Sequence, residues 1–334
     1  MNDNLLDVLT REGVLINASV RYWRATKQLK AEELGLQADQ VTDRLIKLGH
    51  KKLLPKEALA PLALIESRTH ALIENSTFPF LGGLGHFVPN GKLDEVTGGL
   101  RGLEEEFDRE ADRFLNGYAD IRANALSEWE AAAEKLGHDP EMLVAAISAA
   151  FPDVGKLRRS FGFTTQLFQI QVPESLELQL VTEAEQREVG RARQEAITRA
   201  AAQIRSGVQS FVGECVATLR EQTATLCREM LESMNTGKSG VHQRTLNRLV
   251  NFIDQFKELN FVGDQEMETR LENIRREFLS RTAAEYRDNE FATGQLKTAL
   301  NGLAETAREM ATQDTRELVE RFGQMGQRRF HLAA

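Results

Sequence analysis

The clearest pattern of apolar and polar positions lies in residues 92–136, where apolar residues recur at steps of three or four. Twelve such steps cover 43 residues, about 3.6 residues per step, which is the period of an undistorted α-helix. The pattern predicts one nearly straight helix of roughly 65 Å. Gly98, Gly99 and Gly102 weaken its first turns, so we expect its start to fray, bend or admit a close neighbour. The stripe comprises Leu93, Val96, Leu100, Leu103, Phe107, Ala111, Phe114, Tyr118, Ile121, Ala125, Trp129, Ala132 and Leu136.

A second long helix is predicted to open at Thr182, which has capping-box spacing to Glu185. It should stop near residues 235–240, a run that contains two glycines. Further helices follow: one with a stripe over 246–259, one capped by Asp264, and a final stripe over 296–325. Because each exposed Leu or Phe forgoes roughly 1.5–3 kcal/mol of burial, these helices must pair within the chain or between chains. The second long stripe comprises Val189, Ile197, Ala201, Ile204, Val208, Phe211, Cys215, Leu219, Leu226 and Met230.

Three short segments predict strands. Residues 14–23 are rich in β-branched and aromatic residues, and residues 163–172 alternate in their second half. Residues 77–90 carry two aromatic arms around a glycine-rich centre, which predicts a β-hairpin. Pro79 and Pro89 cannot donate to a ladder, so they belong at strand ends or on an edge. Because strand backbones need partners, the three segments should form one small sheet that ties the long helices together.

Shorter amphipathic stretches predict helices at 30–48 and 55–74, which should pack on the strands, and another from Pro140 to about Ala150. The expected fold is therefore mainly α, a long antiparallel helical bundle or coiled coil with a small antiparallel β-sheet. We expect two regions. Residues 1–180 would hold the sheet, its helices and the first long helix, and residues 181–334 would form a helical coiled-coil region.

Composition and charge narrow the classes of partner. The 334 residues are 41% hydrophobic and carry a formal net charge of −8, which argues against bulk attraction to nucleic acid or anionic lipid. The densest basic patches are 156–159, 187–193 and 321–329, and each is expected to be a solvated helix face. The N-terminus has no secretory pattern and no stretch is apolar enough to span a membrane, so we expect a cytoplasmic protein with reduced Cys215 and Cys227.

Complete catalytic motifs are missing from the sequence. The six histidines share no helical i,i+3 or i,i+4 spacing, and neither cysteine lies beside one, so zinc ligation has no support. The acidic run 104–110 lacks the Glu-x-x-His pairs that di-iron bundles need, which favours a solvated face. Tyr22 and Trp23, flanked by two arginines, could stack on bases, although packing at a strand end is favoured. We therefore expect no enzyme activity, no metal site and no cofactor.

The segment Val14 to Trp23, the helix at 55–74 and above all Phe78-Pro-Phe-Leu-Gly-Gly followed by Phe87-Val-Pro resemble the bacterial family catalogued as domain of unknown function 3150. The resemblance covers most of the first 180 residues. Members of that family occur in phages and integrative or conjugative elements, commonly beside a MoxR-type AAA+ ATPase and a von Willebrand A-type protein. The family has no known catalytic residues, so the resemblance implies none here.

These patterns favour a structural or adaptor protein that forms homo-oligomers and contacts other proteins, with the MoxR-type ATPase as the partner that the resemblance implies. Two alternatives stay open: a membrane-acting helical effector that inserts the 77–90 hairpin, and a nucleic-acid-binding accessory protein that uses the arginine patches. The candidate contact surface is the hairpin itself, namely Phe78, Phe80, Leu81, Gly82, Gly83, Leu84, Phe87 and Val88.

Overall fold

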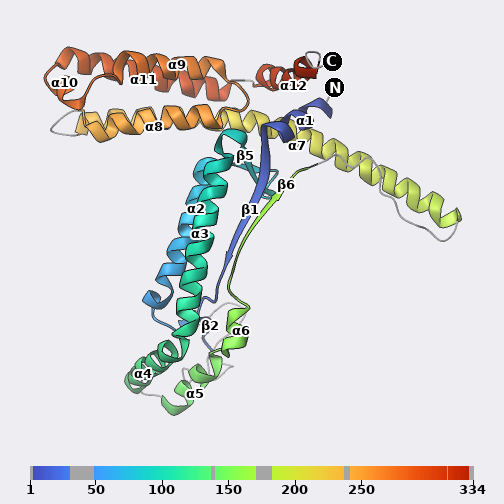
Figure 1. The fold of residues 1–334 in the computed structure, drawn as a ribbon, viewed down its shortest axis with the longest axis vertical. Coiled ribbons are helices and arrows are strands. Elements are labelled where there is room, and N and C mark those ends of the chain that lie inside the picture. The colour runs from blue at the N-terminus through green and yellow to red at the C-terminus, as the bar shows by residue number, and fades with distance from the viewer. Residues whose placement is uncertain are drawn as a thin grey trace. The chain divides into compact units, whose positions relative to one another are not determined.

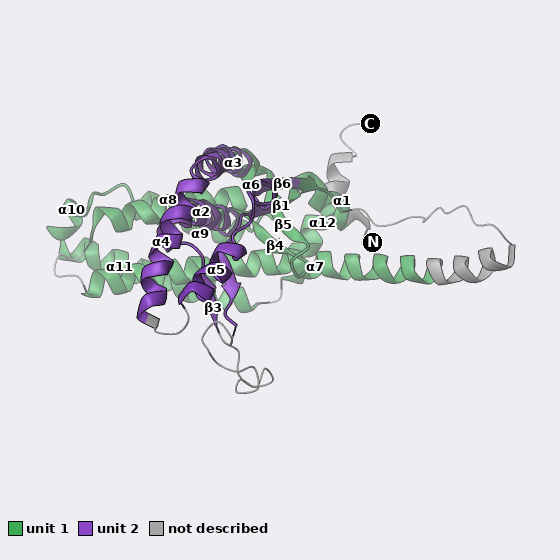
Figure 2. Ribbon diagram, turned by 90° about the horizontal axis from the view of Figure 1, so that it is seen from below, with its two compact units in different colours: residues 1–16, 76–95, 167–334 green, residues 17–75, 96–166 purple. Residues whose placement is uncertain are grey.

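The computed structural model describes residues 3–30, 49–136, 140–170, 183–236, 241–313 and 315–330. The chain divides into two compact units (Figure 2). Unit 1 comprises residues 1–16, 76–95 and 167–334, and unit 2 comprises residues 17–75 and 96–166. This division differs from the expected boundary at 180. Residues 1–16 and the hairpin segment 76–95 belong to the same unit as the C-terminal half of the chain.

Unit 1 is built mainly from long helices (Figure 1). Its elements are α1 Asp3–Glu12, β4 Phe78–Phe80, β5 Gly85–Pro89, α7 Glu183–Thr236, α8 Gln243–Leu259, α9 Gln265–Phe278, α10 Ala283–Arg287, α11 Glu290–Thr312 and α12 Arg316–Phe330. The predicted second long helix is thus confirmed as α7, which ends at Thr236, just before the glycine-containing run. Asp264 caps α9 as predicted, since its side chain accepts a hydrogen bond from the Met267 amide.

Side-chain contacts show that the long helices of unit 1 are antiparallel. Arg220 of α7 bonds to Met310 of α11, whereas Asn235 of α7 accepts a bond from Lys297 of α11. Later residues of α7 therefore contact earlier residues of α11. The ion pairs Lys257–Glu272 and Arg275–Asp254 show the same reversal between α8 and α9. The expected antiparallel bundle is confirmed, and its core is formed by the apolar stripes, including Phe211, Leu249, Phe256, Leu296 and Leu300.

The three predicted strand segments form one small sheet. Its strand order is β4-β5-β1-β6, where β1 is Gly13–Arg21 and β6 is Gly162–Phe168. The hairpin pairs Phe78 with Phe87 and Phe80 with Gly85, and the second side of β5 pairs with β1 through Leu15 and Phe87. Pro79 lies in the edge strand β4, where a missing N–H is tolerated, as predicted.

Unit 2 holds shorter helices around an aromatic cluster. Its elements are β2 Thr26–Gln28, β3 His50–Lys52, the 3₁₀ turn η2 Lys56–Leu59, α4 Tyr118–Leu136, α5 Pro140–Ala150 and α6 Val154–Arg158, together with most of α2 Ala60–Ser76 and α3 Asn90–Asn116. The cluster is centred on Trp23, whose ring lies edge-on to Tyr118 at 6.1 Å and to Phe151 at 5.9 Å between centroids. Strands β2 and β3 pair antiparallel as a separate two-stranded sheet.

The predicted single straight helix over 92–136 is wrong, because it divides into α3 and α4 at Gly117. The backbone bonds continue through this point, since the Gly117 amide donates to Arg113 and the Gly117 carbonyl accepts from Ile121. Figure 1 shows α4 leaving the line of α3. A one-residue bend keeps the phase of the apolar stripe, so periodicity alone could not reveal it. The bend lets the Tyr118 hydroxyl donate to the Pro152 carbonyl at 2.8 Å.

Three other predictions have separate outcomes. Gly99 admits a close neighbour as expected, since a Cβ there would lie 2.8 Å from Leu72 Cδ2. The final stripe over 296–325 is split between α11 and α12, because Gln313 takes an extended conformation that ends α11. The helix predicted at 30–48 lies almost wholly outside the described residues, as do residues 171–172 of the predicted strand.

Candidate contact site at the hairpin of unit 1

The turn that joins β4 and β5 is held in an unusual backbone conformation. Leu81, Gly82 and Gly83 have φ of 41°, 66° and 101°, in the left-handed region that glycine adopts easily. The Phe80 carbonyl accepts hydrogen bonds from the amides of Gly83 and Leu84, both at 3.2 Å. Leu81 has a Cβ and is strained there, so its conformation needs support from packing.

That support comes from a glycine in α7. A Cβ placed on Gly207 would lie only 2.5 Å from Leu81 Cδ2, so the Leu81 side chain sits directly on the bare backbone of this helix. Any side chain at position 207 would displace Leu81. The turn is therefore fixed by its own hydrogen bonds and by its seat on α7.

The two arms of the hairpin are anchored by aromatic packing. Phe80 and Phe87 lie edge-on to Phe211 of α7, with centroids 4.7 and 5.6 Å apart. Phe78 and Phe87 also contact Phe261, at 5.8 and 4.8 Å. Aromatic pairs in such arrangements stabilise by about 0.5–1.5 kcal/mol beyond their buried area.

The structure divides the eight residues of the predicted contact surface into two groups. Phe78, Phe80, Phe87 and Val88 are buried, with at most 4% of their surface exposed, and belong to the interior of the protein. Leu81 is half-buried, whereas Gly82, Gly83 and Leu84 are exposed, Leu84 by 61%. Of these eight residues, only residues 81–84, which we call the hairpin tip, are accessible to a partner. Insertion of the aromatic arms into a bilayer would first withdraw them from this core.

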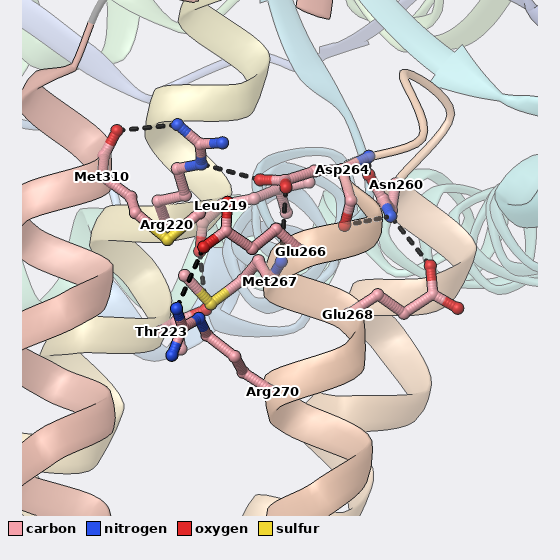
Figure 3. A network of polar contacts seen from close by, with 10 residues as sticks. All are labelled: Leu219, Arg220, Thr223, Asn260, Asp264, Glu266, Met267, Glu268, Arg270 and Met310. Carbon is pink, nitrogen blue, oxygen red and sulfur yellow. Dashed lines mark hydrogen bonds and ion pairs between the residues drawn. The ribbon is translucent and has the colours of Figure 1, made fainter.

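A buried polar network joins three helices of unit 1 (Figure 3). Arg220 Nε donates to Asp264 Oδ2 at 2.7 Å, and Arg220 Nη1 donates to the Met310 carbonyl at 2.7 Å. The side chains of Arg220 and Asp264 are only 6% and 3% exposed. Asn260 completes the network, because its Oδ1 accepts from the Asp264 amide at 2.8 Å and its Nδ2 donates to Glu268. The network holds the start of α9 and the end of α11 against α7.

A second enclosed charge lies at the start of α3. Lys92, 3% exposed, donates to Glu95 and to Glu258, each at 2.6 Å. Burial would lower the pKa of Lys92, but its bonds to Glu258 and Glu95 outweigh burial, so the pKa is raised and the ammonium stays charged. Gly91 permits this approach, since a Cβ there would lie 2.8 Å from the Glu258 carbonyl oxygen.

The two cysteines are free, as predicted, and both are buried. Burial raises the pKa of the Cys227 thiol to about 12 and that of Cys215 well above its ordinary value. Both are therefore protonated thiols at neutral pH, and neither has the thiolate character that a nucleophile needs.

Unit 2 has its own polar cluster near the end of β1. The Tyr22 hydroxyl donates to Glu66 Oε2 at 3.0 Å, and Arg24 forms a two-pronged ion pair with the same carboxylate while its guanidinium lies 4.0 Å from the Tyr22 ring centroid. Burial, and then the bond to Glu66, raises the pKa of Tyr22 to about 12. The bond from Arg24 lowers the pKa of Glu66. Tyr22 and Trp23 thus both serve packing here, as the sequence favoured.

The other candidate functional residues of the sequence do not gather at one place in the described part of the chain. The acidic run is divided by ion pairs, Glu106 with Arg68 and Glu110 with Arg113. Arg158 and Arg321 of the basic patches pair with Asp112 and Glu317 at the surface. A pocket of about 160 Å³ in unit 2 is lined by Leu53, Leu54 and Trp129, together with the carboxylate residue Glu128. Within the described ranges, no three His, Cys, Asp or Glu side chains gather as a metal site.

Sequence reasoning found the hairpin but missed what holds it. The partners Phe211 and Phe261 lie more than a hundred residues away, and no local pattern links them to the hairpin. Arg220 directly follows Leu219 of the apolar stripe, and this position was a signal in the sequence that Arg220 could be a functional residue. Nothing in the local sequence indicates that its partner is Asp264.

Comparison with known proteins gives one result. No curated protein and no solved structure matches the chain. None of the described helices has the length and apolar character needed to cross a membrane. The model of one family, described as "Protein of unknown function (DUF3150)", matches residues 10–214, more than half of the chain and further than the resemblance was predicted to reach. The hairpin and the β1 strand that suggested the resemblance both lie within the match, and the chain belongs to the DUF3150 family.

Proposed function

We propose that the protein is a non-enzymatic structural or adaptor protein of a bacterial mobile element or phage that acts through protein–protein contacts in the cytoplasm. The hairpin tip is one of its contact surfaces. The observation that carries the proposal is Leu84, an apolar side chain 61% exposed at the end of a turn whose neighbours are anchored in the core.

A pre-ordered apolar tip suits recognition. Binding partners lose free energy when they order flexible side chains and loops, and a surface that is already fixed loses less. Phe80 and Phe87 fix the two arms, and Leu81 fixes the turn on Gly207. Leu84 can therefore enter an apolar pocket of a partner without rearrangement of the hairpin.

The buried ionisable groups of unit 1 support the same proposal. Arg220, Asp264 and Lys92 each bond to groups of the chain itself, so these buried charges are used in contacts within the helical bundle. The partner under this proposal is the MoxR-type AAA+ ATPase that the family resemblance implies.

The test measures binding between the purified protein and that ATPase, for example by biolayer interferometry, with and without nucleotide. We expect a complex, and we expect Leu84→Asp to weaken it at least about tenfold, because a carboxylate would be desolvated at the contact. Leu64→Asp is the matched control: Leu64 is a leucine of similar exposure, 58%, on α2. No complex with the ATPase would overturn the choice of partner. Equal binding by both variants would overturn the role of the hairpin tip.

A further inference from the structure

The pocket of about 160 Å³ in unit 2 is lined by the segment that follows β3 and by one face of α4. Residues 53–55 supply the first side of the lining. The second side comes from Ala125, Glu128, Trp129 and Ala132, whose spacing of i, i+3, i+4 and i+7 places them on one face of the helix. The pocket therefore combines aliphatic side chains with one indole ring and one carboxylate.

Hydrogen bonds and the core of unit 2 hold both sides of the pocket in place. Leu53 and Leu54 are buried, and the Leu53 amide donates to the Ala25 carbonyl at 2.7 Å. The Trp129 indole Nε1 donates to the Lys52 carbonyl at 3.2 Å, which fixes the ring against the end of β3. A pocket that is already formed costs a ligand less free energy to fill.

Glu128 gives the pocket a preference for a cation. Its side chain is exposed, and no cation among the described residues forms an ion pair with it. Lys52 and Lys56 adjoin residues of the lining in sequence, but both are exposed and neither belongs to the lining. Helix α4 contains four acidic and two basic residues, so its net charge also attracts a cation. The indole ring of Trp129 adds to this preference, because a cation is attracted to the face of an aromatic ring.

The volume of the pocket limits the size of the ligand. A water molecule takes about 30 Å³ in the liquid, so the pocket holds about five non-hydrogen atoms. Pockets for drug-sized molecules and cofactors are larger, about 300–1,000 Å³. A lysine side chain matches the smaller volume, since it consists of a four-carbon stem and one compact ammonium group. The longer arginine side chain exceeds it.

We propose that this pocket binds a lysine side chain of a partner protein. The carbon stem would lie against residues 53–55, and the ammonium group would lie beside the Glu128 carboxylate and the Trp129 ring. Charge-assisted hydrogen bonds to a carboxylate are stronger than neutral ones, so the ammonium group supplies most of the selectivity. The site is separate from the hairpin tip and does not require the ATPase, so this proposal and the proposed function can fail independently.

The indole N–H signals in a proton–nitrogen NMR spectrum test the site directly. The chain has two tryptophans, so Trp129→Phe assigns both signals and Trp23 serves as the internal reference. The probe is Nα-acetyl-lysine methylamide, which should shift the Trp129 signal saturably with a Kd of about 1–10 mM, the range for one side chain. Nα-acetyl-norleucine methylamide keeps the carbon stem but lacks the ammonium group, and should bind at least about tenfold more weakly.

Two glutamate variants show whether Glu128 holds the ammonium group. Glu128→Gln should weaken binding of the lysine probe at least about fivefold. Glu130→Gln is the matched control and should leave binding unchanged, because Glu130 is equally classed as exposed but lies two residues further along α4, on another face. Circular dichroism checks that both variants are folded.

Three results would overturn the proposal. The first is a Trp129 signal that does not move at about 50 mM lysine probe. The second is equal binding of the lysine and norleucine probes, or an equal effect of the two glutamate variants. The third concerns the source of the amine: butylamine, a free amine with the same carbon stem, should bind no more tightly than the lysine probe. Binding of butylamine at least about tenfold tighter would assign the pocket to a small free amine instead of a protein partner.

Discussion

The two units differ in the solvent exposure of their ion-paired side chains. In unit 1, Arg220 and Asp264 are 6% and 3% exposed, and Lys92 is 3% exposed. In unit 2, Arg24 pairs with Glu66 and Arg68 pairs with Glu106, and each arginine is 51% exposed. Unit 1 therefore bears a desolvation cost for these enclosed charges, in addition to its surface pairs such as Lys257–Glu272, whereas the pairs of unit 2 are largely hydrated.

The difference indicates what each set of charges does. A buried ion pair is weak evidence for stability, but it penalises every arrangement that separates its members. We interpret the Arg220 network as a device that sets the register of α7, α9 and α11, whose apolar stripes alone would tolerate sliding. Unit 2 draws its specificity from the irregular aromatic cluster around Trp23, where ring shapes already define the packing.

The two units can be followed separately in one sample. The chain has two tryptophans, Trp23 and Trp129, and both lie in unit 2. Tryptophan fluorescence therefore reports on unit 2, whereas circular dichroism at 222 nm is dominated by the long helices of unit 1. Urea unfolding followed by both signals compares the effect of each variant on the two units.

The largest effect is expected from Arg220→Met. It leaves Asp264 buried without its cation, which should lower the free energy of unfolding by about 3–5 kcal/mol, seen as a shift of the dichroism curve to lower urea. Adding Asp264→Asn should recover part of the loss, because the amide is neutral and can still cap α9. A shift no larger than that of Arg24→Met would break the comparison between the units.

A smaller loss is expected from Lys92→Met. The two carboxylates that it leaves behind, Glu95 and Glu258, are 53% and 46% exposed, so water can hydrate them. We expect a loss of about 1.5–3 kcal/mol, the range for hydrogen bonds to charged groups, again in the dichroism curve. Lys257→Met, which removes a surface pair with Glu272, serves as the control and should cost less than about 1 kcal/mol. Equal losses would show that enclosure of Lys92 has no energetic consequence.

Arg24→Met should have the smallest effect on stability at neutral pH. The Arg24–Glu66 pair is half-exposed, so its loss should cost about 0.2–1 kcal/mol, measured from the fluorescence curve. The stacking of Arg24 on Tyr22 adds to this loss. A loss above about 3 kcal/mol would place this pair among the buried ones.

The contribution of this cluster should also depend on pH at both extremes. The lowered pKa of Glu66 means that its contribution is present above its ordinary pKa of 4.5 and is lost as the pH falls through the lower folded value. The raised pKa of Tyr22 means that its contribution is present below pH 10 and is lost as the pH rises through about 12. Absorbance at 295 nm should show Tyr22 titrating near pH 12, and Tyr22→Phe should remove that step. A Tyr22 step near pH 10 would contradict the burial of the Tyr22 hydroxyl and its bond to Glu66.

Much of the fold could be predicted because its signals are local and repeated. The 54-residue helix α7 follows from one apolar stripe, and the hairpin follows from two aromatic arms around glycines. The bend at Gly117 could not be predicted, since a one-residue bend leaves the stripe in phase. At the site, the exposed hairpin tip was within reach of the sequence, but the burial of Phe78, Phe80 and Phe87 was not, because strand residues can face either the core or solvent.

The sequence by itself determined that this protein is an antiparallel arrangement of long helices with a small sheet, and that its hairpin marks membership of the DUF3150 family. Apolar periodicity and the residue preferences of turns depend on residues close together in sequence, so they can be recognised from the sequence alone. Only the tertiary structure decided that the hairpin arms meet Phe211 and Phe261, that Arg220 meets Asp264, and that β6 ends the sheet. Those contacts join residues far apart in sequence, and their partners are selected by shape and burial, which a linear pattern does not record.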